Sequence, residues 1–445
     1  MEKNTLSGSK DSGKQKTVLV AMTGRVSSSV AAYLLKKQGL RPIGISVCFY
    51  GEEKEFEYDT SLFPGIQKQQ FEKNKYYGPI RGHYHIENLE KVKKVCDNLE
   101  IPFYAVNAQD IFKEKILDPF VASRLMGEVF SPSAFAVKTI VEILIEKAKK
   151  LDADFIATGH FAKIQKSGEK KRVSVYTSND LEFDQSHELS LVKQSELEKL
   201  MLPLSEMRSI ETEKIASIIG VSREQVYRHA DEVYRDDPRI TSLVQRESPL
   251  SLRNEGEIYH YFNDIILGDH DGIHYYYPGK RKLSSRTTPV IDSSLAVVKI
   301  QPAYKRVILA PVDDMDYDHL VCRKYFSNGV EDITKITTAF LKIHGRNDKL
   351  PCHLIFKSNG NVVIKLSTKQ SGRSFVGERV YFYSKQDKGG KLLATAIVHT
   401  SCNYKMGLLH EFPPRDEELQ SIEDAQTNEN ANPYLTDLEH SRHHF

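Results

Sequence analysis

Apolar and polar residues alternate in a regular order over the first third of the chain. From Thr17 to about Gly159, the apolar runs TVLVAM, RPIGISVCFY, IPFYAVN and DFIATG are separated by longer segments. In two of these segments, IENLEKVKKVCDNLE and KTIVEILIEKAKKL, apolar residues recur every three or four positions, as they do on one face of a helix. This order of short strands and helices predicts an α/β fold with a parallel sheet covered by helices.

The rest of the chain shows two further patterns. The segments SELEKLMLPL and SIETEKIASIIGVSREQVYRHA indicate helices, whereas from about Ala296 onward short strands and hairpin turns such as Asn359-Gly360 predict a small β-barrel. The charged stretch 51–82 has no clear period, and we expect a long loop or insertion near the ligand-binding edge of the sheet. We therefore predict a disordered N-terminus (1–16), an α/β domain (17–193), a small and mostly helical central domain (194–290), a C-terminal β-barrel (291–412) and a disordered acidic tail (413–445).

The charged residues indicate that the chain without its acidic tail is mildly basic. Lys plus Arg (62) and Asp plus Glu (60) nearly balance over the 445 residues, but the stretch Pro413–Phe445 carries a net charge of −6 and leaves the remainder near +8. A mildly basic body is compatible with an anionic partner such as RNA, and equally with a merely soluble surface.

The cysteines and the N-terminal sequence indicate the cellular compartment in which the protein is expected. The N-terminal sequence MEKNTLSGSKDSGKQK lacks the apolar core of a signal peptide, and no apolar run approaches the roughly 18 residues of a membrane span. We expect a cytoplasmic protein with neither a membrane nor DNA as partner. The cysteines are odd in number and form no CxxC pair, which argues against a disulfide framework and a zinc knuckle: Cys48, Cys96, Cys322, Cys352 and Cys402.

One candidate ligand site lies where the first strand turns into a helix, at AMTGRVSSSV (21–30). Backbone N–H groups and the helix dipole at such a turn favour an anion, and a glycine lets phosphate approach closely. VCFYGE and ATGHFAK also follow strands, so all three segments should meet at the carboxyl edge of the sheet. Taken alone, the turn is more typical of a plain capped helix than of a phosphate site.

The segment AMTGRVSSSVAAYLLKKQG resembles the PP-loop of the tRNA-specific 2-thiouridylase (MnmA/TrmU) family, whose pattern is G-M-S-G-G-V-D-S-S-V-A-A. The resemblance continues to about Thr400 through VCDNLEIPFYAVN, DADFIATGHFAKI, DQSHEL, LPLSEM, LGDHDGIHYYYPGKRK and FVGERVYFY. It implies a PP-loop (adenine nucleotide alpha hydrolase-like) domain, a small central domain and a C-terminal β-barrel. In that family ATP adenylates the wobble uridine of a tRNA, and a cysteine persulfide then delivers sulfur.

The resemblance also implies two sets of binding residues. One set corresponds to nucleotide-binding positions: Thr23, Gly24, Arg25, Ser27, Ser28, Val47, Gly159 and His160. The other set corresponds to tRNA contacts: Ser131, Pro132, Ser133, Asp184 and Gln185.

A basic run adds a third candidate RNA contact. Lys280, Arg281 and Lys282 stand in a tyrosine-rich stretch, and tyrosine rings beside cations can stack on unpaired bases. An ordinary solvated turn is the competing interpretation. Against RNA binding, His344 and Gly345 replace an Arg-Tyr pair by which the family's barrel meets tRNA.

The nucleotide-binding loop departs from the family pattern at two positions. Arg25 replaces the second glycine and Ser27 replaces the aspartate. A bulky cation now stands where backbone should meet pyrophosphate, and a partner for the metal that accompanies ATP is lost. Arg25 could itself pair with phosphate, so we expect ATP to bind weakly or not at all.

Both sulfur-carrying cysteines are absent. Ala136 stands at the first one, Ser133 at the base-contacting aspartate, and Ser242 or Thr241 at the second cysteine. Persulfide chemistry needs a thiolate to carry sulfur and another to release it. Only Cys48 lies near the nucleotide site, and it is more simply read as a small apolar residue. Several histidines lack the companions of a metal site, and no metal cluster is expected: His83, His85, His440, His443 and His444.

Two functions therefore remain in view. The favoured one is a catalytically degenerate relative that acts as a tRNA-binding protein or binds a protein partner, including an active paralogue. The alternative is an active ATP-dependent tRNA sulfurtransferase that makes 2-thiouridine with non-standard residues. The missing catalytic groups, set against the persisting fold-forming segments, favour the first.

Overall fold

A computed structural model describes 15–49, 88–167, 172–221, 244–247, 255–261, 265–281, 283, 291–311, 317–327, 330–343, 348–358, 360–370, 376–403 and 407–408. The predictions for the N-terminus, for the 51–82 stretch and for the acidic tail lie outside these residues. So do Thr241, Ser242, Lys282, His344 and Gly345, as well as the five histidines weighed for metal binding.

The first domain is a five-stranded parallel sheet in the order β3-β2-β1-β4-β7. Its strands are β1 (Thr17–Ala21), β2 (Arg41–Cys48), β3 (Phe103–Asn107), β4 (Phe155–Ala157) and β7 (Leu200–Met201). Helices cover both faces, because alternate residues of a strand point to opposite sides of the sheet. Leu19 packs with the helix α6 (Pro132–Lys150), and Val18 with α1 (Val26–Lys37) and α3 (Leu89–Asn98). The predicted parallel α/β sheet is confirmed.

Shorter elements complete this domain. A hairpin of β5 (Lys163–Ser167) and β6 (Arg172–Tyr176) follows β4 and leads to two 3₁₀ turns, η4 (Leu181–Phe183) and η5 (Ser186–Leu189). The remaining helical elements are α4 (Gln109–Phe112), the π-helical η3 (Lys113–Leu117), α5 (Asp118–Leu125), α7 (Gln194–Leu197) and α8 (Ser209–Ile218).

The region predicted as a helical central domain is divided between two units. Its first part extends the α/β domain, since β7 pairs with β4 and α8 packs beside α1. Its later part forms a four-stranded sheet, β10-β11-β8-β9, together with the η7 turn (Ile273–Tyr275). The strands are β8 (Gly256–His260), β9 (Ile266–His270), β10 (Leu295–Gln301) and β11 (Arg306–Pro311), with the η8 turn (Pro302–Tyr304) between the last two.

The C-terminal unit is a closed barrel of six antiparallel strands, as predicted. The order β12-β15-β14-β13-β16-β17 closes through the pairing of β12 with β17, and β18 (Gly407–Leu408) extends β17. The strands are β12 (Tyr317–Ser327), β13 (Thr338–Ile343), β14 (Leu350–Phe356), β15 (Val362–Gln370), β16 (Arg379–Tyr383) and β17 (Leu392–Asn403), and a 3₁₀ turn, η10 (Ile333–Lys335), precedes β13.

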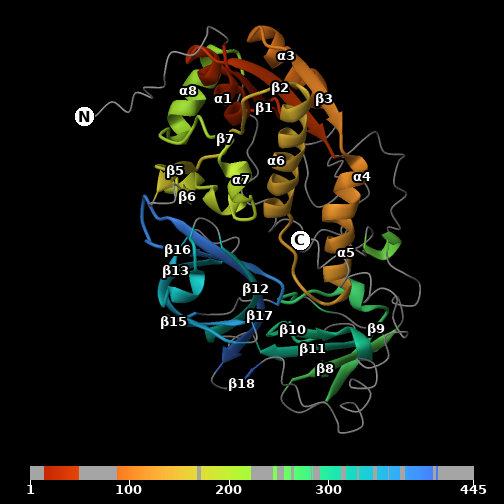
Figure 1. The fold of residues 1–445 in the computed structure, drawn as a ribbon. Helices are drawn as coiled ribbons and strands as arrows, with labels where there is room; N and C mark the ends of the chain where they lie inside the picture. The colour runs from red at the N-terminus through yellow and green to blue at the C-terminus, as the bar shows by residue number, and fades with distance from the viewer. Residues whose placement is uncertain are drawn as a thin grey trace.

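The barrel docks on the α/β domain through the outer face of β16. Val380 and Phe382 point into the barrel core, whereas Tyr381 and Tyr383 join the core around α6. Figure 1 shows the sheet above, the barrel below it, and α6 reaching from the sheet toward the β-rich units. Among the described residues, no helix combines the length and apolar character that crossing a bilayer requires.

Candidate functional site

The turn between β1 and α1 is held by its own polar groups. The Thr23 N–H donates to Oγ of Ser28 (3.2 Å), and the two hydroxyl oxygens lie 3.0 Å apart. The Ser28 and Ser29 hydroxyls both donate to the Arg25 carbonyl, at 3.2 and 2.7 Å. Gly24 has φ +71°, a conformation that L residues adopt only with strain. The turn thus has the shape that the sequence predicts, although its hydroxyls are engaged internally.

Gly159 packs directly against this turn. A Cβ on Gly159 would stand 2.7 Å from the backbone of Ser27 and Ser28, so no larger residue fits. His160 follows immediately, and its Nδ1 lies 2.8 Å from the Thr158 hydroxyl. The structure therefore brings the turn and the Gly159-His160 segment together, as predicted.

The positions of the other predicted nucleotide-binding residues do not by themselves indicate a ligand. Arg25 is the N-cap residue of α1 with φ −101°, a conformation open to any residue. Its side chain therefore replaces glycine without backbone strain. Val47 is buried near the end of β2, in the core shared with α6, so its side chain contributes packing. Ser27 is half-buried beside Gly159.

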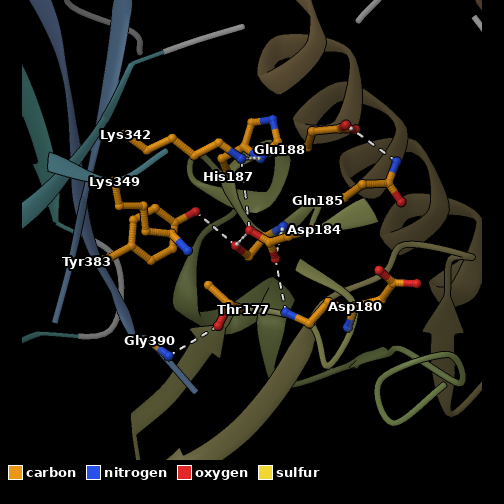
Figure 2. A network of polar contacts seen from close by, with 12 residues as sticks. Thr177, Asp180, Asp184, Gln185, His187, Glu188, Lys342, Lys349, Tyr383 and Gly390 are labelled. Carbon is orange, nitrogen blue, oxygen red and sulfur yellow. Dashed lines mark hydrogen bonds and ion pairs between the residues drawn. The ribbon is translucent and has the colours of Figure 1, made fainter. Parts of the chain in front are cut away.

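Asp184 lies in a buried polar network between the α/β domain and the barrel (Figure 2). Its Oδ1 accepts from the N–H groups of Ser178 (3.0 Å) and Ser186 (3.3 Å), and its Oδ2 from the Ser186 hydroxyl (2.9 Å). The Ser186 hydroxyl also lies 2.8 Å from the Tyr383 OH. Asp184 is only 7% exposed, so its carboxylate could reach RNA only if this network opened.

Two barrel lysines enter the same network. Lys342 Nζ stands 4.0 Å from Asp184 Oδ2 and 3.2 Å from Nδ1 of His187. Lys349 lies over the Tyr383 ring, 4.9 Å from its centroid. Burial lowers the pKa of both lysines, and the nearby Asp184 carboxylate opposes this shift. Burial also raises the pKa of the Tyr383 phenol, which stays protonated.

Gln185 connects this network to the turn. Its side-chain Oε1 accepts from the Phe161 N–H (3.1 Å), and its Nε2 donates to Oε1 of Glu188 (3.4 Å). Glu188 Oε2 lies 3.3 Å from Nε2 of His160. One short segment, 184–189, therefore contacts both the nucleotide-site candidates and the barrel.

The start of α6 carries the positions of the predicted tRNA contacts. Ser131 is the N-cap and Pro132 the first helical residue, and Ser133 is half-buried in the first turn. Phe130 stacks on Phe135 with ring centroids 5.0 Å apart, the hydrophobic staple of a helix start. Ala136 is 2% exposed and packs in the core, where a reactive side chain would have no access to solvent.

The first residue of the basic run is held against neighbouring tyrosines. Lys280 Nζ donates to the Tyr275 carbonyl (2.7 Å) and lies over the rings of Tyr276 and Tyr277. Both of these tyrosines are buried, so they are not available to stack on bases. Arg281 is exposed and could meet a phosphate.

The four cysteines whose side chains the structure describes are poor nucleophiles. Burial raises the pKa of Cys48 and of Cys322, and it raises the pKa of Cys96 and of Cys352 to about 12. These four thiols are therefore protonated near neutral pH, when only the thiolate attacks. Among the described residues, no group of histidine, cysteine and carboxylate side chains could hold a metal ion.

Sequence reasoning missed the barrel side of this region. Lys342, Lys349 and Arg379 are buried, yet a lysine or arginine in or beside an alternating strand normally indicates a solvent-facing position. The segment FVGERVYFY carries a signal of this contact, because its two outward-facing tyrosines indicate that β16 is covered on both faces.

Comparison with known proteins identifies related chains. Residues 16–231 match the family described as "tRNA methyl transferase HUP domain". The chain is 28% identical over 370 residues to tRNA-specific 2-thiouridylase MnmA of Clostridium perfringens, covering 83% of this chain and 95% of the relative. The enzyme of the same name from Clostridium beijerinckii is 28% identical over 385 residues (86% and 100%), and that of Geotalea uraniireducens 27% over 399 residues (89% and 99%).

Proposed function

Because this chain belongs to the tRNA-specific 2-thiouridylase family, we propose that it binds tRNA and does not itself transfer sulfur. Its relatives are named for a reaction on tRNA and align with it over almost their full length, so tRNA is the expected ligand. The fold of the PP-loop domain and barrel persists, while the groups that do the chemistry do not.

One observation carries the proposal: Ala136, which the resemblance puts at the first sulfur-carrying cysteine, is a core residue. A methyl group there can neither accept nor release sulfur. The four cysteines whose side chains the structure describes, Cys48, Cys96, Cys322 and Cys352, offer no substitute, since burial keeps them protonated and enclosed. Cys402 lies in β17 of the barrel, and its side chain is outside the description.

The nucleotide site supports the same conclusion. ATP binding belongs to the family's PP-loop, and Gly24, the α1 N-terminus and Gly159 preserve the shape of such a loop. Arg25 and Ser27 supply a cation and a hydroxyl where a glycine and a metal-binding carboxylate would serve the triphosphate. We infer that ATP binds weakly and that tRNA binding does not depend on it.

The decisive test is the 2-thiouridine content of tRNA, measured by mass spectrometry in cells with and without this chain. We expect equal content. A fall on removal would contradict the proposal and support the alternative, an active sulfurtransferase with non-standard residues.

A second test measures tRNA binding by filter retention at roughly 50 and 200 mM salt. Phosphate contacts should make the affinity fall steeply with salt. A triple Lys280/Arg281/Lys282→Ala variant should bind more weakly. The control is Arg41→Ala, an exposed arginine at the amino end of β2. Absence of binding at low salt would leave a protein partner as the better ligand.

A further inference from the structure

His187 and Lys342 form a hydrogen bond between the two domains (Figure 2). His187 lies in η5 of the α/β domain and Lys342 in β13 of the barrel, and 3.2 Å separates Nδ1 of the histidine from Nζ of the lysine. Lys342 is 5% exposed, so water offers its ammonium group little in place of this acceptor. The bond therefore contributes to the docking of the barrel on the α/β domain.

This bond requires a neutral histidine. An ammonium group has donors and no acceptor, so Lys342 donates and Nδ1 of His187 accepts. Nδ1 accepts only in a neutral imidazole that carries its proton on Nε2, whereas an imidazolium donates from both nitrogens. The Asp184 carboxylate, whose Oδ2 lies 4.0 Å from the same Nζ, favours the charged form of the lysine. Protonation of His187 would thus break the bond and set two positive charges against each other.

The charged groups around the bond do not offset an added proton. Lys349 is a second buried cation of the barrel, beside the uncharged ring of Tyr383. Asp184 already accepts three hydrogen bonds. Glu188 accepts from Gln185, and its Oε2 lies 3.3 Å from Nε2 of His160. The carboxylates of this segment are therefore engaged elsewhere.

The elements packed against η5 add no further carboxylate among the described contacts of His187. Tyr381 of β16 presents a ring 5.2 Å from the His187 ring, and phenols are uncharged near neutral pH. Lys138 of α6 is turned to Glu142, 3.9 Å away, and Arg172 of β6 lies near Lys391. The side chains that α6 and β6 contribute to the core shared with η5 are apolar: Val137, Val141, Val173 and Val175.

We propose that the bond between His187 and Lys342 is a pH-sensitive switch, which holds the barrel against the α/β domain at neutral pH and releases it in mild acid. An unperturbed histidine titrates near pH 6.5, well above carboxylates at about 4. The unfolded chain takes up this proton freely, whereas the bond opposes its uptake in the folded chain. The stability that the bond contributes is therefore complete above about pH 7 and is lost as the pH falls.

The first test compares the full chain with His187→Asn by urea titration at pH 7.5 and 5.5. Asparagine places an amide oxygen near the position of Nδ1, so it can accept from Lys342 at both pH values and does not titrate. Between the two pH values, the folded-to-unfolded ratio of the unaltered chain should fall by up to about 10-fold more than that of His187→Asn, because a histidine with a pKa of 6.5 is about 90% protonated at pH 5.5. Equal responses would overturn the proposal.

Lys342→Met separates the bond from simple burial of the imidazole. In this background His187→Asn should no longer change the pH response, because the like charge and the donor have both been removed. A full His187-dependent response without Lys342 would assign it to burial and contradict the switch.

His160 titrates in the same pH range and needs its own control. Its protonation would strengthen the ion pair with Glu188, which is the opposite sign. His160→Gln should therefore keep the loss of stability in acid. Loss of the acid response in His160→Gln, with the response retained in His187→Asn, would place the switch at the wrong histidine.

Hydrogen exchange followed by mass spectrometry locates the opening, comparing the two proteins at one pH so that the intrinsic exchange rates cancel. At pH 5.5, peptides from η5 and β13 should exchange faster in the unaltered chain than in His187→Asn, and at pH 7.5 they should exchange alike. Peptides from β12, whose Leu320 and Cys322 belong to the barrel core, should not differ at either pH. No difference at η5 and β13, or an equal difference at β12, would refute a local release of the barrel.

Discussion

Two of the places where the barrel meets the α/β domain differ in how their polar groups are matched. At the first, the 184–189 segment, Asp184 accepts three hydrogen bonds and faces Lys342, while Ser186 and Tyr383 share a contact. At the second, the start of α6, the Arg379 guanidinium lies over the Phe135 ring, 5.0 Å from its centroid, and the Val129 N–H donates to the Val376 carbonyl. The first arrangement is complete without a ligand and therefore fits a structural role. The second depends on an aromatic ring and a backbone hydrogen bond in place of matched charges.

The largest effect is expected from breaking the matched junction. Asp184→Ala removes the acceptor of three hydrogen bonds and leaves Lys342 and Lys349 buried without it. We expect a loss of about 3 to 5 kcal/mol in the free energy of unfolding, measured by urea titration. Glu198→Ala, at an exposed position, should change stability by less than about 0.5 kcal/mol. A similar loss in the free energy of unfolding for both variants would contradict a structural role of the junction.

A somewhat smaller loss is expected at the α6 junction, from Gly377→Ala. Gly377 has φ +89°, and a Cβ there would stand 2.3 Å from the Val129 carbonyl oxygen. Because this oxygen is backbone, it cannot move aside easily, and we expect a loss of about 2 to 3 kcal/mol. Gly389→Ala, with φ +72° and open space around its Cβ, controls for the backbone conformation alone. Equal losses would show that close packing at Val129 is unimportant.

The β1–α1 turn offers a third point of comparison, because its hydroxyls are satisfied internally and it nevertheless resembles a phosphate site. Restoring the family's residues with Arg25→Gly and Ser27→Asp should strengthen binding of ATP with magnesium by about 1.5 to 3 kcal/mol in calorimetry. The single Arg25→Gly variant separates the two changes. Tight ATP binding by the unaltered chain would show that these residues are no obstacle.

The matched junction should also respond to pH. Lys342 and Lys349 have lower pKa values in the folded chain than the 10.5 of the unfolded chain, because they are buried. The unfolded chain then binds more protons, so the stability contributed here is reduced below the folded pKa values and recovers as pH rises toward 10.5. A double Lys342/Lys349→Met variant should lose this alkaline increase in the free energy of unfolding. An unchanged slope would argue that the lysines are solvated.

The smallest expected effect is no reaction at all. At pH 7.5 iodoacetamide should leave Cys48, Cys96, Cys322 and Cys352 unmodified in the folded chain, since burial raises the pKa of each thiol. Mass spectrometry of the peptides, with urea-unfolded chain as the positive control, makes the measurement. Rapid modification of Cys48 would restore it as a candidate nucleophile near the turn.

The parallel sheet and the barrel could be predicted because their signals are local. Apolar runs mark β1, β2 and β4, and hairpin turns mark the barrel strands, including Gly360 with φ +80°. The four-stranded sheet could not be predicted from the sequence. Its strands β8 and β9 are short and polar, and β8 pairs with β11, which lies some fifty residues further along the chain. Such pairings depend on tertiary contacts that periodicity does not report.

Part of the candidate site could likewise be predicted from the sequence, and part could not. The meeting of the turn with Gly159 and His160 follows from strand order, since carboxyl ends of parallel strands share one edge. The burial of Asp184 and Arg379 does not follow, because it is created by a second domain that covers them. The roles of the predicted nucleotide and tRNA residues remain predictions.

The contact between Val129 and the barrel has a consequence for the order of assembly during synthesis. The Val129 N–H donates to the Val376 carbonyl (2.7 Å), so the segment that precedes α6 is completed by residues made almost 250 positions later. A ribosome delivers residues in sequence, and domains fold as they emerge. The nascent α/β domain must therefore hold its sheet together while the start of α6 is still uncovered. The Phe135 ring, which Arg379 of β16 contacts in the folded chain, stays uncovered on that side until β16 has been made.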